Sequence, residues 1–416
     1  MRAPAYSDVA DELFQPTHIN DPHLLYTRLR DTMPLSQIAD TGVHLVANWD
    51  LIHQVLEREE DFSANLSGVL VRGEDNQPAC FELQQSDATR VIATADEPHH
   101  TVHRDILHAR FTPRQISKLE PLVKHWAKQY LAPIFESGGG DVIDACERIP
   151  ALVVAELLGL PKQDVDDFRV WAMMGGDMLA GEVSLDQMMF LAEQTQKMSG
   201  YLGRHLDEAL MNPNLTSEAT LMHTLAQGVQ ASRINREEAL GIATVLFGAG
   251  GESTAALVAS CVKLLASDKE LAKQLRADLS LIPRFVEEVV RLESPFKFHY
   301  RSVRQACELN GFELKKGDRL MLLWAAANRD GSVIDEPAQL KLDRKHPKQH
   351  MGFGRGVHFC IGAVLARLEA VAVIETLLCQ ICQNAALKLD ASKTSYAQSI
   401  FVRRLDKLTL RITSVS

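Results

Sequence analysis

The sequence has 416 residues, and the features it lacks exclude several classes of protein. No apolar run near the N-terminus approaches the roughly 20 residues that span a bilayer. Residues 1–34 are mixed and charged, without the apolar core of a signal peptide. Basic residues are in deficit, giving a formal net charge of −10, whereas nucleic-acid binding calls for a basic face. We therefore expect a soluble, cytoplasmic protein with no membrane or nucleic-acid partner.

Cysteine is also scarce. The seven cysteines are scattered and odd in number, which argues against a disulfide framework. Cys379 and Cys382 form a C-x-x-C late in an apolar helical segment, with no strand before them and no second pair to complete a metal site. We expect both to be buried core cysteines rather than a redox or zinc site.

The sequence contains no repeat, low-complexity tract or Pro/Ser-rich linker, and its hydrophobic content of 46% is sufficient for a large core. Apolar residues at spacings of three and four predict helices from about Pro113 to Leu279. Strand-like alternation occurs at Leu35–Val46, Val303–Leu323 and Lys407–Ile412. In the second of these segments, Asn310-Gly311 is a favoured two-residue hairpin turn. The pattern predicts a mainly helical protein with small peripheral β-sheets.

The longest predicted helix begins after Asn235, where Glu238 completes a capping box, and continues to about Ala266. It contains residues 248–254, of sequence GAGGEST. Glycines inside a helix cost about 0.8–1 kcal/mol each relative to alanine. Two interpretations explain why three are kept: close approach of a flat cofactor with a local opening of the hydrogen-bond ladder, or close packing of another helix. We favour the first, because an acid and two hydroxyls follow at once.

The most informative segment is residues 353–362, of sequence FGRGVHFCIG. Cys360 stands at the end of this glycine-rich loop, immediately before a long apolar segment that predicts a helix. Unpaired N–H groups and the helix dipole favour a thiolate there, and the glycines let the backbone turn against a large flat group. A thiolate in this position suits a haem iron. The alternative is a buried free cysteine beside glycines that merely form a turn.

The pattern Phe-Gly-x-Gly-x-His-x-Cys-x-Gly in residues 353–362 resembles the haem loop of the cytochromes P450. Further segments match that family in order: ADEPHHTVHR at 95–104, FTPR at 111–114, EEVVR at 287–291, SPFKFHYR at 294–301 and ANRD at 327–330. The resemblance covers about Asp21 to Ile412 and fits soluble bacterial members. It implies a mainly α fold with small β-sheets, a long central helix over the haem, and a single domain spanning residues 1–416.

By resemblance, the cofactor is haem b (heme b, iron protoporphyrin IX), and Cys360 is the axial ligand of its iron. His100, Arg104, Arg301 and His358 match residues that bind the haem propionates, and such donors neutralise carboxylates well. For His100 and Arg104, which share one helical face, the alternative is a solvated basic face. The other positions that match cofactor contacts are Ala249, Gly250, Phe353, Gly354, Ile361 and Gly362.

A charge network is implied on the cysteine side of the fold. Glu288 and Arg291 resemble the family's Glu-x-x-Arg pair, and Arg344 resembles the third member. Such a network supports the fold and performs no chemistry. On its own, an ion pair at i and i+3 is commonplace.

The resemblance further implies an O2-dependent monooxygenase that hydroxylates a hydrophobic small organic substrate. Glu252 and Ser253 occupy the positions of the family's acid and threonine, and Thr254 follows. These three are the predicted catalytic residues, which deliver protons through an acid and a hydroxyl. Serine is a departure from the family: it keeps the hydroxyl but lacks the methyl group that stiffens threonine.

Electrons must come from a partner, because no flavin or iron–sulfur motif occurs in this sequence. A ferredoxin with its NAD(P)H-dependent ferredoxin reductase is the expected source. Arg110, Arg114, Lys118 and Arg355 could form a docking face for an acidic ferredoxin. A solvated surface is the equally weighted alternative.

The sequence does not name the substrate. The expected pocket segments are rich in Met, Leu and Phe, which suits a hydrophobic ligand, although plain core is the commoner role of such faces. These segments are Ser63–Val71, Met173–Phe190, Leu246–Gly250, Phe296–Tyr300 and Ser395–Val402. Candidates to meet a polar group of the substrate are Lys297, His299 and Arg403. Two other functions stay open: a peroxygenase that uses H2O2, and a non-catalytic haem sensor or carrier.

Overall fold

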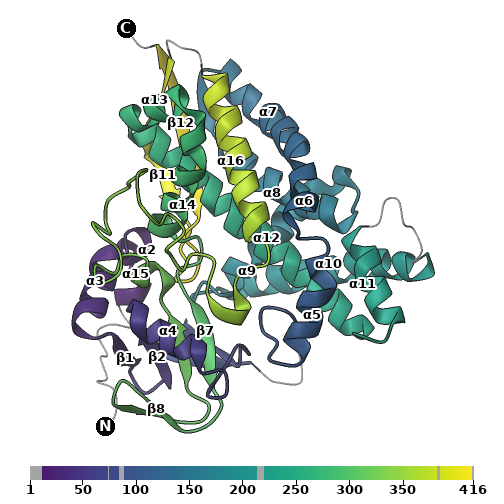
Figure 1. The fold of residues 1–416 in the computed structure, drawn as a ribbon, viewed down its shortest axis with the longest axis vertical. Coiled ribbons are helices and arrows are strands. Elements are labelled where there is room, and N and C mark those ends of the chain that lie inside the picture. Colours follow the sequence, from purple (N-terminus) through teal and green to yellow (C-terminus); the bar gives the residue numbers. More distant parts are fainter. Residues whose placement is uncertain (1–11, 74, 84–88, 213–219, 382–384, 415–416) are drawn as a thin grey trace.

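The longest helix of the computed structural model, α12 (Arg236–Ser267), runs through the middle of the molecule (Figure 1). Its start is the predicted capping box. The Asn235 side chain accepts a hydrogen bond from the Glu238 amide at 2.7 Å, and the Glu238 carboxylate accepts one from the Asn235 amide at 2.8 Å. The structure describes residues 12–73, 75–83, 89–212, 220–381 and 385–414.

The expected mainly helical architecture is confirmed. The other described helices are α2 (Pro16–Asn20), α3 (His23–Thr32), α4 (Trp49–Glu57), α5 (His99–His108), α6 (Pro113–Ile116), α7 (Glu120–Glu136), α8 (Ile143–Leu158), α9 (Val165–Met178), α10 (Leu185–Met211), α11 (Leu221–Gln230), α13 (Lys269–Ala277), α14 (Ile282–Glu293), α15 (Trp324–Ala327) and α16 (Ala363–Gln380). Short 3-10 turns occur at Ser117–Leu119, Lys162–Asp164, Leu279–Leu281 and Gly356–His358. Helices α8, α9, α10 and α16 all pack on α12, so α12 is a core helix.

Burial also explains the apolar composition of α12. Among the described residues it is the one helix long and apolar enough to cross a membrane, but 67% of its most apolar window is buried inside the protein. The core helix of a soluble protein has this same property. We therefore assign its apolar surface to packing against the neighbouring helices.

The strands form small sheets beside the helices (Figure 1). They are β1 (Leu35–Ile38), β2 (Val43–Val46), β3 (Phe62–Ser63), β4 (Gly68–Arg72), β5 (Pro78–Glu82), β6 (Gly139–Asp141), β7 (His299–Val303), β8 (Cys307–Leu309), β9 (Phe312–Leu314), β10 (Arg319–Leu322), β11 (Ala385–Tyr396) and β12 (Leu405–Ser414). One sheet has the order β1-β2-β10-β7-β3, in which β2 and β10 are parallel and the other pairs are antiparallel. A second sheet has the order β11-β12-β6.

The three predicted strand segments are confirmed. The first is the β1–β2 hairpin, and the third lies within β12. In the second, Asn310 and Gly311 both adopt positive φ, at 52° and 78°, between β8 and β9, as a tight hairpin turn requires. The alternation pattern does not predict β11 or the β4–β5 hairpin.

Two of the three glycines in residues 248–254 of α12 serve helix packing, whereas a Cβ atom at Gly248 would meet nothing within 4 Å. A Cβ atom at Gly250 would lie 2.9 Å from Val154 of α8, and a Cβ atom at Gly251 would overlap Ala172 of α9. The helix continues without interruption through residues 248–254, so the expected opening of its hydrogen-bond ladder does not occur. Small residues here let α8 and α9 approach α12 closely.

The expectation for the C-x-x-C pair is wrong for Cys379, which is exposed on α16. Leu377 and Leu378 take the buried positions of that turn. Cys379, the next residue along the helix, points away from the core. Cys382 lies outside the described residues.

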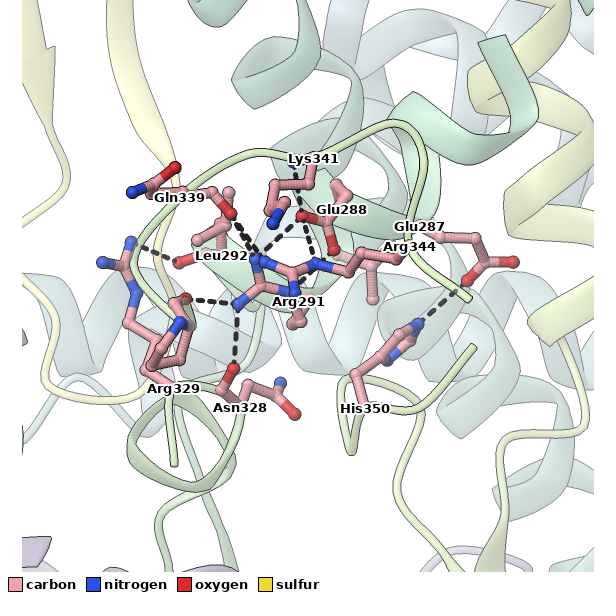
Figure 2. Close-up of polar contacts among 12 residues, drawn as sticks. Glu287, Glu288, Arg291, Leu292, Asn328, Arg329, Gln339, Lys341, Arg344 and His350 are labelled. Atoms are coloured by element: carbon pink, nitrogen blue, oxygen red, sulfur yellow. Dashed lines mark hydrogen bonds and ion pairs between the residues drawn. The ribbon is translucent and has the colours of Figure 1, made fainter. Parts of the chain in front are cut away.

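The implied charge network is present: Glu288 and Arg291 are buried, and Figure 2 shows their contacts with Arg344 and the neighbouring loop. Arg291 donates from Nε and Nη2 to the two carboxylate oxygens of Glu288 at 2.8 and 2.9 Å, and Arg344 Nε lies 2.8 Å from Glu288 Oε2. Burial raises the pKa of Glu288, but the hydrogen bonds from these two arginines outweigh burial, and the pKa lies below its ordinary value. A depressed carboxyl pKa stabilises the fold above the unfolded pKa of about 4.3, and the contribution is lost as the pH falls through the folded pKa.

The network continues toward residues 353–362, which we call the cysteine loop. Arg291 Nη1 donates to the Asn328 carbonyl at 3.1 Å, and the Asn328 side chain accepts a hydrogen bond from the Met351 amide at 2.5 Å. In the same region, His350 Nε2 lies 2.9 Å from a carboxylate oxygen of Glu287 (Figure 2). Helix α14 is thereby tied to the chain that precedes residue 353.

Replacing Arg291 with methionine is expected to lower the free energy of unfolding by about 3–5 kcal/mol, because it removes one partner of a buried ion pair. Chemical denaturation of the two proteins measures this difference. Arg284→Met is the matched control in the same helix: Arg284 is exposed and donates to the loop carbonyls of Leu342 and Arg344, so its loss is expected to cost about 1 kcal/mol or less. Equal losses in the two variants would contradict the role of the buried pair.

Candidate active site

A cavity of about 240 Å³ lies between α12, α5, α8 and the cysteine loop. Its apolar wall includes Val154, Leu157 and Leu158 of α8 and Val245 and Leu246 of α12. Two of the five expected pocket segments, residues 246–250 and 296–300, contribute to this wall, whereas the described residues of the other three do not. The contribution of α8 to the cavity wall was not predicted from the sequence.

Cys360 faces this cavity from the loop before α16. The Cys360 amide donates to the Phe353 carbonyl at 2.9 Å, which closes the loop. Gly354 and Gly356 have φ of 67° and 72°, the left-handed conformation that glycine adopts without a Cβ penalty. The glycine spacing of the motif is therefore needed for this turn.

The N-terminus of α16 is not sufficient by itself to convert the Cys360 thiol to the expected thiolate. Burial is the largest influence on Cys360 and raises the pKa of its thiol, and this outweighs the opposing effects of the Gly362 and Ala363 amides and of Arg104 and Arg367. In an apolar cavity the sulfur keeps its proton unless a cation replaces it. A metal ion does this, because thiolate ligands release their protons on binding.

Three of the predicted propionate ligands lie together at one end of the cavity. The rings of His100 and His358 are 4.0 Å apart between centroids, and Arg301 lines the cavity beside them. His100 Nδ1 lies 3.1 Å from Glu97 Oε1, whereas its buried Nε2 has no hydrogen-bond partner. Burial lowers the pKa of Arg301 to about 10 and that of His358 to about 3. Arg301 is buried, and no described carboxylate forms an ion pair with it.

The residues present therefore fit a haem. Its propionates match the free His100 Nε2 and the poorly compensated Arg301, its iron matches the Cys360 sulfur, and its ring matches the apolar wall. Arg104 also lines the cavity, but its Nη1 donates to the Phe359 carbonyl at 2.9 Å. Arg104 thus braces the cysteine loop as well. The other predicted contact residues all line the cavity: Ala249, Gly250, Phe353, Gly354, Ile361 and Gly362.

The acid and the hydroxyls of α12 point in different directions. Ser253 and Thr254 line the cavity, and Ser253 Oγ donates to the Ala249 carbonyl at 2.7 Å. Glu252 is fully buried and turns toward α9, where its Oε2 accepts a hydrogen bond from the Gly176 amide at 2.7 Å. The other oxygen, Oε1, has no hydrogen-bond partner.

Glu252 is held as a neutral acid near neutral pH. Burial raises its pKa to about 8, against the opposing charge of Arg404. The Arg404 Nε atom is 3.6 Å from Glu252 Oε1, while its Nη2 donates to Asp177 at 2.9 Å. Because Asp177 takes the stronger contact, Arg404 compensates Glu252 only in part. Neither Gly176 nor Arg404 was identifiable from a local motif; only the Gly175-Gly176 pair inside a helical segment hints at a special contact.

The polar candidates for substrate contact have structural partners instead. Lys297 Nζ donates to the Ser399 carbonyl and Arg403 Nε donates to Glu293, both at 2.7 Å and both buried. His299 does line the cavity, and its Nδ1 accepts a hydrogen bond from the Trp324 ring at 2.7 Å. Of the three, only His299 faces the cavity.

Similarity to known proteins extends over nearly the whole chain. The family model of cytochrome P450 matches residues 188–404. Cytochrome P450 144 of Mycobacterium tuberculosis is 35% identical, over 97% of this chain and 92% of that protein. Vitamin D(3) 25-hydroxylase of Pseudonocardia autotrophica is 31% identical, with 95% of each chain covered. The crystal structure of CYP109E1 from Bacillus megaterium in complex with testosterone has a TM-score of 0.81 and 26% identity, covering 95% of this chain and 99% of that one.

Gly176 is expected to be intolerant of a side chain. A Cβ atom there would overlap the Glu252 carboxylate, whereas a Cβ atom at Gly175 would meet Glu252 Oε2 at an ordinary 3.7 Å. Gly176→Ala should therefore lower the free energy of unfolding by about 1–3 kcal/mol, while Gly175→Ala should be neutral or stabilising by up to about 1 kcal/mol. Chemical denaturation of both variants tests this, and equal effects would show that the carboxylate does not occupy this space.

Proposed function

Because the chain belongs to the cytochrome P450 family, we propose that it hydroxylates a hydrophobic small organic molecule, using O2 and two electrons from a ferredoxin. Membership of the family makes it a haem-thiolate monooxygenase that binds haem b. The haem, when bound, supplies activation of O2, which electron donation from a thiolate ligand favours. The observation that carries the proposal is the single cavity lined by Cys360, by Ser253 and by the predicted propionate donors.

The proposed roles in holding the haem follow from the cavity. Cys360 is the axial ligand. His100, Arg301 and His358 bind the propionates: the buried His100 Nε2 has no hydrogen-bond partner, the buried Arg301 forms no ion pair with a described carboxylate, and the His358 ring lies 4.0 Å from that of His100. Arg104 shares that role while bracing the cysteine loop through the Phe359 carbonyl. We further propose that the whole chain, residues 1–416, acts as one domain.

The proposed proton route runs from Glu252 to Ser253, with Thr254 as a second hydroxyl on the cavity wall. A carboxyl with a pKa near 8 is protonated at neutral pH and can act as a general acid. Its unpartnered Oε1 can carry the proton, and rotation of the side chain away from the Gly176 amide would bring it toward the cavity. The Ser253 hydroxyl donates one hydrogen bond, to the Ala249 carbonyl. When that bond breaks, the hydroxyl can rotate and relay the proton.

The proposed electron donor is an acidic ferredoxin, reduced by an NAD(P)H-dependent reductase in the cytoplasm. Arg114, Lys118 and Arg355 are exposed, and no described carboxylate pairs with them. Exposed Val364 lies at the start of α16, close to the cysteine loop in sequence. Exposed basic groups suit docking of an acidic partner through complementary charge. Arg110 is less available, because its Nε donates to Thr224 at 2.9 Å.

The proposed substrate is hydrophobic because most of the lining side chains are aliphatic or aromatic. Of the three predicted polar candidates for substrate contact, His299 is the one that lines the cavity and could orient the substrate. A relative named as a vitamin D(3) hydroxylase and a related structure that holds testosterone accept large apolar molecules. A peroxygenase is a weaker candidate, because an acid–hydroxyl pair stands in α12. A haem sensor or carrier is weaker for the same reason.

Replacing Cys360 with serine is expected to abolish the red-shifted Soret band of the ferrous–CO complex, because no sulfur ligand remains. Absorption spectra of the reduced, CO-treated variant check this. Cys379→Ser removes an exposed cysteine of α16 that does not line the cavity and is the control; its spectrum should match that of the parent protein. Persistence of the red-shifted band in the Cys360 variant would remove Cys360 as the ligand.

Ser253→Ala is expected to reduce the product formed per NAD(P)H by about 10-fold or more and to raise peroxide release, because general acid–base groups typically contribute 10²–10⁴-fold. Haem content should be unchanged. Thr254→Ala, beside it on the same wall, is the comparison and should have the smaller effect. Unchanged coupling in Ser253→Ala would count against the relay.

Coupling should decline as the pH rises through about 8, where Glu252 loses its proton. In Asp177→Asn, Arg404 is released to pair with Glu252, which favours the charged carboxylate and lowers its pKa. The decline should then begin at lower pH. Product per NAD(P)H measured from pH 6 to 9.5 tests both statements, and Glu252→Gln should remove this pH dependence. An unshifted profile in Asp177→Asn would contradict the part assigned to Arg404.

A further inference from the structure

A cluster of three potential metal ligands lies where helices α5 and α12 begin. His99 is the first residue of α5, His103 is one turn further on, and Glu238 stands in the first turn of α12. His99 Nδ1 and His103 Nε2 lie 3.3 and 3.5 Å from the same oxygen, Oε1 of Glu238. All three ligand atoms are within 4.8 Å of one another.

Each of these residues has a free ligand atom. His103 is fully buried, and its Nε2 points at Glu238 without a hydrogen-bond partner. The other carboxylate oxygen of Glu238 already caps α12 through the Asn235 amide, which fixes the carboxylate and leaves Oε1 directed at the histidines. His99 is 70% exposed, so an ion can reach the cluster from solvent.

We propose that His99, His103 and Glu238 bind a zinc ion. Zinc prefers a tetrahedron of nitrogen and oxygen ligands at about 2.0–2.1 Å, and such bonds place neighbouring ligand atoms about 3.4 Å apart. Two of the three pairs already have this spacing. The third pair, between the two histidines, closes by rotation of the exposed His99. Water completes the fourth position.

Binding requires one local rearrangement. The Ile92 amide donates to His103 Nδ1 at 3.2 Å, which places the proton of the neutral ring on Nε2. Zinc takes the Nε2 lone pair, the ring proton moves to Nδ1, and the Ile92 hydrogen bond must open. No proton is gained or lost by the ring in this exchange. Because Ile92 lines the cavity, zinc binding is coupled to the cavity wall.

Zinc titration of the haem-loaded protein by calorimetry, after chelator treatment, tests the site. A Cys379→Ser background removes the exposed thiol of α16. We expect one saturable zinc per chain, bound at least about 10-fold more weakly after His99→Gln or Glu238→Gln. Glutamine at 238 preserves the capping box, so that variant should fold. His108→Gln, which removes an exposed histidine of the same helix outside the cluster, should bind like the parent.

Two results would overturn the proposal. One is absence of saturable binding, or equal affinity in the parent, His99→Gln and Glu238→Gln proteins. The other is binding without faster hydrogen exchange of the Ile92 amide, which would remove His103 as a ligand. The haem spectrum serves as a separate readout, so failure of the zinc site would leave the proposed monooxygenase function unaffected.

Discussion

At the Cys360 sulfur, burial and hydrogen bonding act in opposite directions. The amides at the start of α16 and two arginines favour a thiolate, but burial outweighs them and favours the thiol. A cation bound at the sulfur reverses this balance, because the charge that burial penalises is then neutralised. The surrounding contacts position the Cys360 sulfur for that cation. Arg104 of α5 braces the cysteine loop, and the Asn328–Met351 hydrogen bond holds the chain segment that precedes the loop.

Two buried glutamates show how partners decide what a carboxyl does. Glu288 and Glu252 are both fully buried. Glu288 receives direct hydrogen bonds from Arg291, and Arg344 lies within bonding distance, so its pKa falls and it is a structural anion. Burial raises the pKa of Glu252 to about 8, because Arg404 donates to Asp177 and compensates the Glu252 charge only in part. Glu288 is therefore a carboxylate at neutral pH, whereas Glu252 is protonated and can donate a proton.

Features encoded by neighbouring residues were predictable, and contacts between distant segments were not. The Asn235 capping box and the Asn310-Gly311 turn follow from local backbone chemistry. The cysteine loop follows from a family resemblance carried by closely spaced residues. By contrast, Gly250 and Gly251 of α12 are explained by helices that lie close only after folding, and a single helix pattern does not show which face meets α8 or α9. The Glu252–Gly176 contact belongs to this second class, as does the exposure of Cys379.

The central claim is that the Cys360 sulfur binds the haem iron. X-ray absorption at the iron edge of the purified, haem-loaded protein measures the ligand directly. The account predicts one sulfur atom in the first coordination shell of the iron, and its loss in Cys360→Ser. A first shell of nitrogen and oxygen atoms alone in the unsubstituted protein would contradict it.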